Sequence, residues 1–256
     1  MNKGITMGGI LDLVSPVAQR ALEDIWDATI GSWIGLWADK KKFDREMEFA
    51  DYKNKILTEW HKIPDDKKTD PKFAIVGPAL EASKFYIDEE ILRDMFAKLI
   101  ANSMNLDKQQ FARSAFVEII KQMSPTDAKI LKTFMIDSSQ PLSRFIEYSG
   151  GDSQNVKKDQ YQKLIDQVYT MPGEENKSVS DVLSNGISIN NLSRLGLLEY
   201  VVTKITGERL ANDELYQPHM RIMEEQIKPG HPHVDIIKGV VKVTQLGDAF
   251  IKSCME

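Results

Sequence analysis

The chain has 256 residues, of which 42% are hydrophobic and 28% charged, and its net charge is −5. This composition is that of a folded globular protein and excludes a chain that is disordered throughout. The acidic balance disfavours a dedicated nucleic-acid binder, because basic residues that neutralise phosphates supply most non-specific affinity. The single cysteine cannot form an internal disulfide, and no apolar run near the N-terminus reaches the ~20 residues of a spanning helix. We therefore expect a cytoplasmic protein.

The first predicted region, residues 1–62, consists of amphipathic helices. Ser15 and Pro16 suit the start of a helix, and apolar residues then recur at three- and four-residue steps. One helix face carries the tryptophans Trp26, Trp33 and Trp37. This stripe is expected to pack on the protein's own core, with binding of a partner or second copy as the next interpretation and membrane contact as the third.

A linker and a helical region follow. Residues 63–72 hold two prolines and several charges, which cannot build a core. In the region 73–123, two adjacent apolar rows predict a buried helix that starts near Asp88, and a second such helix ends at Met123. Because the connection is short, we expect these two helices to form an antiparallel pair.

Residues 124–256 are predicted to form a winged-helix-like module. It begins with a helix at Pro125, which Ser124 can cap. Residues 137–155 are rich in Ser and Gly and are expected to form a loop. A further helix is predicted over 161–168.

A strand pair completes the predicted module. Ser188 is expected to cap a short helix that Gly196 ends. Strand-favouring residues occupy 197–203 and 240–243, and the segment of about 204–239 between them is an enlarged insertion with a helical stretch of its own. The predicted fold class is therefore mainly α: a helical bundle followed by a winged-helix-like module with a two- or three-stranded antiparallel sheet.

Motifs of known catalytic sites are absent from the sequence. It contains no P-loop, dinucleotide fingerprint, nucleophile elbow or zinc framework. His231, His233 and Asp235 could offer a metal two imidazoles and a carboxylate, but a solvated hairpin is the favoured interpretation. Cys254 falls on the apolar side of the last helix and is expected to be buried. We expect no enzyme activity, no cofactor and no metal.

DNA binding would use the helix that precedes Gly196. Its candidate readers of base edges are Asn190, Asn191 and Arg194. Only Arg194 among them is positively charged, so nucleic acid is not the favoured partner.

Four stretches resemble the Abi-alpha (abortive infection alpha) family. They are PALEASKFY at 78–86, FVEIIKQMSPTDA at 116–128, NLSRLGLL at 191–198 and VTQLGDAF at 243–250. The resemblance runs from about residue 73 to the end of the chain. It implies a bacterial or phage-borne protein linked to abortive infection, in which an infected cell stops growing, and it carries over no catalytic residues.

The sequence thus predicts a non-enzymatic anti-phage protein that binds a phage or host protein, with a homodimer as one option. The alternatives are a winged-helix DNA-binding regulator and a membrane-acting effector that uses the N-terminal helices.

Overall fold

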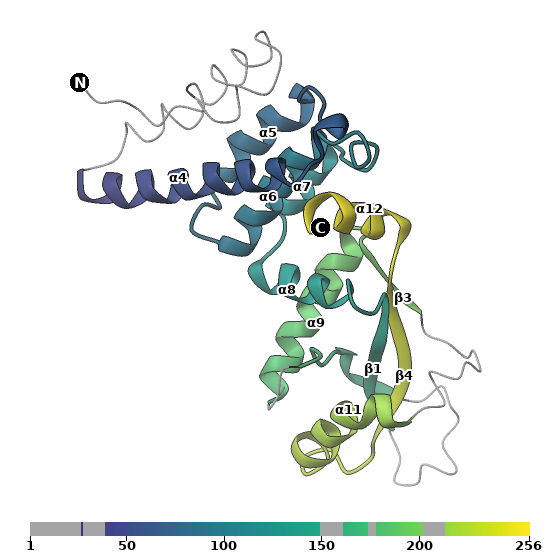
Figure 1. The fold of residues 1–256 in the computed structure, drawn as a ribbon. Helices are drawn as coiled ribbons and strands as arrows, with labels where there is room; N and C mark the ends of the chain where they lie inside the picture. Colours follow the sequence, from purple (N-terminus) through teal and green to yellow (C-terminus); the bar gives the residue numbers. More distant parts are fainter. Residues whose placement is uncertain (1–26, 28–38, 149–160, 174–177, 202–212) are drawn as a thin grey trace. The chain divides into compact units, whose positions relative to one another are not determined.

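The computed structural model describes residues 27, 39–148, 161–173, 178–201 and 213–256 (Figure 1). The chain divides into two compact units. One comprises Met1–Pro125 together with Ala249–Glu256, and the other comprises Thr126–Asp248. The predicted tryptophan stripe, Trp26, Trp33 and Trp37, lies outside the described residues.

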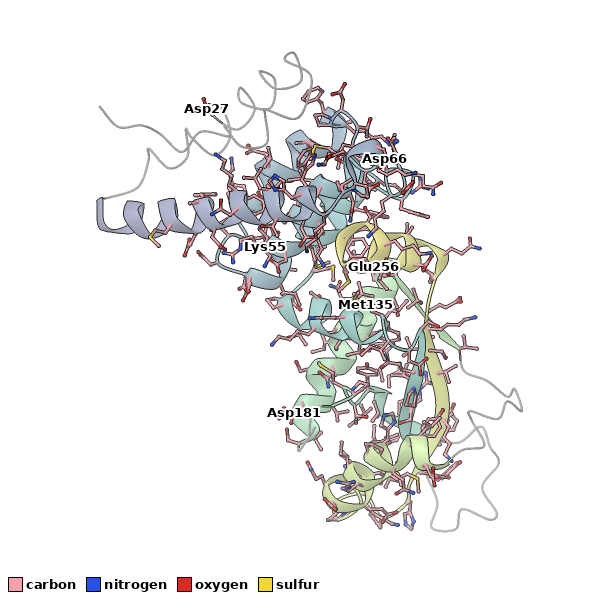
Figure 2. The ribbon with its side chains drawn as sticks, viewed as in Figure 1. Asp27, Lys55, Asp66, Met135, Asp181 and Glu256 are labelled. Carbon is pink, nitrogen blue, oxygen red and sulfur yellow. The ribbon has the colours of Figure 1, made fainter. Side chains whose placement is uncertain are left out.

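The first unit is helical. Its elements are α4 (Asp39–His61), the short 3₁₀ turn η2 (Asp65–Lys67), α5 (Phe73–Ser83), α6 (Glu90–Ser103), α7 (Ala115–Lys121) and the last residues of α12 (Gln245–Cys254). Helix α4 packs against α6, and its aromatic side chains Tyr52 and Trp60 are fully buried. Lys55, labelled in Figure 2, joins the same two helices through an ion pair to Asp94 of 2.9 Å.

The two apolar rows of α6 are buried as their spacing predicts, except for the half-buried Ile91 at the start of the helix. The C-terminal residues complete this core. The ring of Phe250 meets the ring of Phe116 edge to face at 5.1 Å between centroids. The Asn102 side-chain amide donates to the Ser253 carbonyl oxygen at 3.0 Å. Residues far apart in the sequence therefore close one helical core.

The second unit is built on a four-stranded antiparallel sheet in the order β2-β1-β4-β3. Its strands are β1 (Ser139–Tyr148), β2 (Tyr161–Val168), β3 (Leu198–Val201) and β4 (Val234–Val243). The two long central strands, β1 and β4, run side by side (Figure 1), with Phe145 opposite Ile236. The prediction of two or three strands was wrong. The segment 137–155, which was expected to be a loop, contains β1, and the segment 161–168, which was expected to be a helix, forms β2.

Bulges in β2 explain why that strand was predicted as a helix. Ser143 lies opposite Val168 and Phe145 lies opposite Ile165, so that two steps along β1 match three along β2. Ile165 and Val168 are consequently both buried at a spacing of three. That spacing is typical of one helix face, whereas a regular strand alternates every second residue.

The helices of the second unit are α8 (Pro125–Thr133), α9 (Val179–Arg194), the 3₁₀ turn η3 (Asp213–Tyr216), α11 (Gln217–Ile222) and the π-helical turn η4 (Met223–Ile227), followed by the start of α12. The predicted start of α8 at Pro125 is confirmed, and so is helical structure within the predicted insertion. The mainly helical class is confirmed, but the winged-helix arrangement is not.

Helix α9 is one continuous helix of 16 residues, where the sequence predicted a short helix that begins at Ser188. Ser178 caps it, with its hydroxyl oxygen accepting from the Asp181 amide at 3.2 Å (Asp181 is labelled in Figure 2). Ser188 is buried within the helix and does not cap it, so that prediction was wrong. Gly196 has a φ of 76° just beyond the helix end, which confirms its predicted role there.

The hydrophobic core of the second unit lies between α9, the sheet and the insertion. It contains Phe145, Ile165, Val168, Val182, Ile222, Met223 and Val234. Helix α9 crosses β2 so closely that a Cβ on Gly186 would lie 2.5 Å from the Gln167 carbonyl oxygen. This crossing positions the segment that follows β2, which forms part of the cavity described next.

Candidate functional site

A cavity of about 910 Å³ opens in the second unit. Part of its wall comes from the end of α8, the turn after it and the start of β1. The rest comes from the segment after β2 and from η3, α11 and η4. The polar and charged lining includes Thr133, Asp137, Gln140, Thr170, Glu214, Arg221 and Glu225. The volume falls within the range of roughly 300–1,000 Å³ that is typical of ligand sites.

A hydrogen-bonded network forms one side of the cavity. The buried Gln140 donates from its side-chain amide to the Thr133 hydroxyl oxygen at 3.0 Å. The Tyr169 hydroxyl donates to the Gln140 amide oxygen and lies 3.0 Å from the Thr133 hydroxyl. Burial raises the pKa of Tyr169 to about 12, so the phenol keeps its proton at neutral pH. Thr133 and Gln140, which line the cavity, are therefore tied to Tyr169 in an uncharged network.

A buried histidine stands behind the cavity wall. The Nδ1 atom of His219 lies 2.8 Å from the Ser143 hydroxyl oxygen, and its Nε2 atom lies 3.1 Å from the Thr170 hydroxyl oxygen. Burial lowers the pKa of His219 to about 4, because the interior disfavours the charged imidazolium. The imidazole is thus neutral at pH 7 and supports Thr170, which lines the cavity.

The Ser143–His219 pair has the spacing of a nucleophile and its base, but it lacks the access that catalysis requires. Both side chains are fully buried, so a substrate could not reach the serine oxygen. The second imidazole nitrogen contacts a hydroxyl, where a catalytic triad would place a carboxylate. We interpret the pair as a structural support for the cavity wall.

Charged and apolar side chains share the rim of the cavity. Asp137, Glu214 and Glu225 bring three carboxylates to it, against the single guanidinium of Arg221. Ile136 is 94% exposed at the same rim, and its neighbour Met135, labelled in Figure 2, is also exposed. The rim therefore combines exposed apolar side chains with charged ones.

The three predicted DNA-reading residues have different positions at the end of α9. Asn190 is exposed. Asn191 donates from its side-chain amide to the carboxylate of the buried Asp127 at 2.8 Å. Arg194 donates in turn to the Asn191 amide oxygen at 2.8 Å. Asn191 and Arg194 thus form an internal chain of hydrogen bonds that joins α9 to α8.

Replacing Asn191 by Ala should lower the free energy of unfolding by about 1–2 kcal/mol, because the buried Asp127 carboxylate loses one donor. Asn190→Ala is the matched control and should change it by less than about 0.5 kcal/mol, since that side chain is exposed. Urea unfolding of the two variants measures the difference. Equal effects would contradict a structural role for Asn191.

The remaining sequence candidates lie elsewhere. His231 Nδ1 is 3.2 Å from a carboxylate oxygen of Glu147, while His233 and Asp235 are exposed. Among the described residues, no group of three or more His, Cys, Asp or Glu side chains could hold a metal ion.

Cys254 is buried as predicted, and burial raises the pKa of its thiol. Within the described parts of the chain, no helix has both the length and the apolar character needed to cross a membrane.

Sequence reasoning missed the cavity because its wall depends on β1 and β2. His219 carried no motif, and its partners Ser143 and Thr170 are 76 and 49 residues away along the chain. A strand prediction for 139–148, where Leu142, Phe145 and Ile146 are buried, would have been the first useful signal.

Comparisons with known proteins agree with the family motifs. The family model described as "Abortive infection alpha" matches residues 44–254. No curated protein matches the chain. A solved structure, that of an uncharacterized protein from the hydrocarbon-degrading marine bacterium Alcanivorax borkumensis SK2, is similar at 14% identity and a TM-score of 0.27, over 57% of this chain and 92% of that chain. A likeness of this degree carries no argument about fold or function.

Proposed function

Since the chain belongs to the abortive infection alpha family, we propose that it acts in the cytoplasm of a phage-infected cell by binding a phage or host protein, without catalysing a reaction. The family supports a role in abortive infection. The observation that carries the binding mode is the cavity of about 910 Å³, whose reactive-looking pair, Ser143 and His219, lies buried behind the wall.

The character of the rim favours a protein over a small metabolite. Small-molecule sites usually enclose most of their ligand, whereas exposed apolar side chains with polar neighbours mark surfaces that meet other proteins. Ile136 and Leu215 are exposed apolar residues at the rim, and Arg221 and Glu225 are exposed polar neighbours. A protruding segment of a partner would cover them while it entered the cavity.

The tryptophans Trp26, Trp33 and Trp37 remain a proposed second contact, either with the same partner or with another copy of the chain. Their spacing on one predicted helix face is the support for this part of the proposal.

An acidic substitution at the rim tests the proposed function. Ile136→Asp should abolish protection in a plaquing assay on cells that express the full chain, because the carboxylate replaces an apolar contact. The unfolding temperature should change little, since the side chain is 94% exposed.

Ile187→Asp is the matched control, because Ile187 is 71% exposed on α9 and does not line the cavity. It should leave protection intact. The reverse result, with protection lost only at Ile187, would contradict the cavity as the binding site. It would instead favour the exposed face of α9 and the DNA-binding alternative, which a gel shift at rising salt would then decide.

A further inference from the structure

The cavity and its rim form a surface that is complementary to itself. We propose that two copies of the chain associate about a two-fold axis through this rim, so that Ile136 of each copy enters the cavity of the other. This inference goes beyond the proposed function, because it assigns a second copy of the chain to the same surface.

One surface carries both a projecting apolar side chain and a recess that can receive it. Ile136 is 94% exposed, and it lies at the edge of a cavity of about 910 Å³. Pro172, Leu215 and Pro218 line that cavity and are themselves exposed. An isoleucine side chain that enters from another copy would remove its own apolar surface and theirs from water, which favours association.

The shared position of side chain and recess limits the association to two copies. In a two-fold interface the same patch is used on both subunits, so that each contact occurs twice. A recess on a different surface would instead allow copies to add one after another into an open filament. Because Ile136 lies at the rim of its own cavity, the arrangement closes as a dimer.

The charges of the rim fit the same arrangement. Arg221 of α11 and Glu225 of η4 both line the cavity, and among the described residues no hydrogen bond or ion pair engages either side chain. Asp137 and Glu214, by contrast, have interactions within their own chain. The two-fold axis would pair Arg221 of each copy with Glu225 of the other. Exposed ion pairs add little affinity, but they determine which surfaces meet and in which orientation.

The dimer closes the cavity to other ligands. If the proposed function holds, a phage or host protein and the second copy compete for one rim. Self-association would then keep the binding surface covered until a partner displaces the second copy.

Sedimentation velocity over a concentration series of the purified full chain tests the dimer. We expect a species of twice the 29.1 kDa mass of one chain. Ile136→Asp should raise the dimer Kd at least about ten-fold, because a carboxylate replaces the inserted side chain. Ile187→Asp is the matched control, since Ile187 is 71% exposed but lies outside the cavity lining, and it should change the Kd less than about two-fold.

A chain that stays at the mass of one copy up to its solubility limit would overturn the proposal and leave the rim to another protein. A dimer that Ile136→Asp does not weaken would overturn it as well, because the two copies would then meet elsewhere.

A charge exchange tests the two-fold pairing. Arg221→Glu alone and Glu225→Arg alone should each weaken the dimer at least about five-fold, because like charges then meet at both symmetric contacts. The double variant Arg221→Glu/Glu225→Arg restores opposite charges at both contacts, and so does an equal mixture of the two single variants. Both should dimerise within about two-fold of the unmodified chain. A double variant and a mixture as weak as the single variants would overturn the proposed arrangement.

This inference and the proposed function can fail separately. If the chain dimerises through the rim but Ile136→Asp cells keep full protection, the dimer stands and the proposed function is wrong. If the chain is monomeric but Ile136→Asp removes protection, the proposed function stands and this inference is wrong.

Discussion

Lowering the pH from 7 to 5 is expected to reduce the free energy of unfolding by about 2 kcal/mol through His219 alone. Burial lowers the pKa of this imidazole from 6.5 to about 4 in the folded chain. Between these two values the unfolded chain binds a proton that the folded chain does not, so acid stabilises the unfolded state. The loss begins as the pH falls through 6.5 and is complete near pH 4, where the folded imidazole also becomes protonated.

His219→Gln isolates this contribution, because an amide can still hydrogen-bond to Ser143 and Thr170 but does not titrate. Urea unfolding at pH 7 and pH 5 should show a smaller stability loss for this variant than for the unmodified chain. His233→Gln, at an exposed position, should keep the full loss. An unchanged pH dependence in His219→Gln would show that the imidazole is not held neutral in the folded state.

Replacing Gly186 by Ala is expected to lower the free energy of unfolding by about 2–3 kcal/mol, although alanine is the better helix former by about 1 kcal/mol. The added methyl group would lie 2.5 Å from the carbonyl oxygen of Gln167. That atom belongs to the backbone of β2, so it cannot rotate away as a side chain could. Helix α9 would have to move off the sheet.

Gly230→Ala provides the comparison, because the nearest atom to its Cβ would be the Ile227 carbonyl oxygen at an ordinary 3.8 Å. The free energy of unfolding of this variant should differ from that of the unmodified chain by less than about 0.5 kcal/mol in the same urea titration. A Gly186→Ala variant as stable as the unmodified chain would contradict the close crossing of α9 over β2.

Several elements could be predicted because their signals are local. A serine-proline pair starts α8, the two apolar rows of α6 bury it, and Gly196 ends α9 with the left-handed backbone that glycine favours. Each of these features depends on residues within a few positions of one another.

Other elements could not be predicted, because distant parts of the chain decide them. Gly186 lowers helix propensity locally, yet α9 continues through it because the helix must approach the backbone of β2. The spacing of Ile165 and Val168 is typical of a helix, yet pairing with β1 through bulges makes the segment a strand. Packing energy against the rest of the second unit outweighs local propensity at both places.

By itself, the sequence determined the buried face of α6, the start of α8, the end of α9 and the family, because periodic apolar residues, helix-end signals and short motifs act over a few residues each. Only the tertiary structure decided the four-stranded sheet and the cavity. The physical reason is that strand pairing and the meeting of Ser143, Thr170 and His219 depend on contacts between segments separated by tens of residues, which no local pattern records.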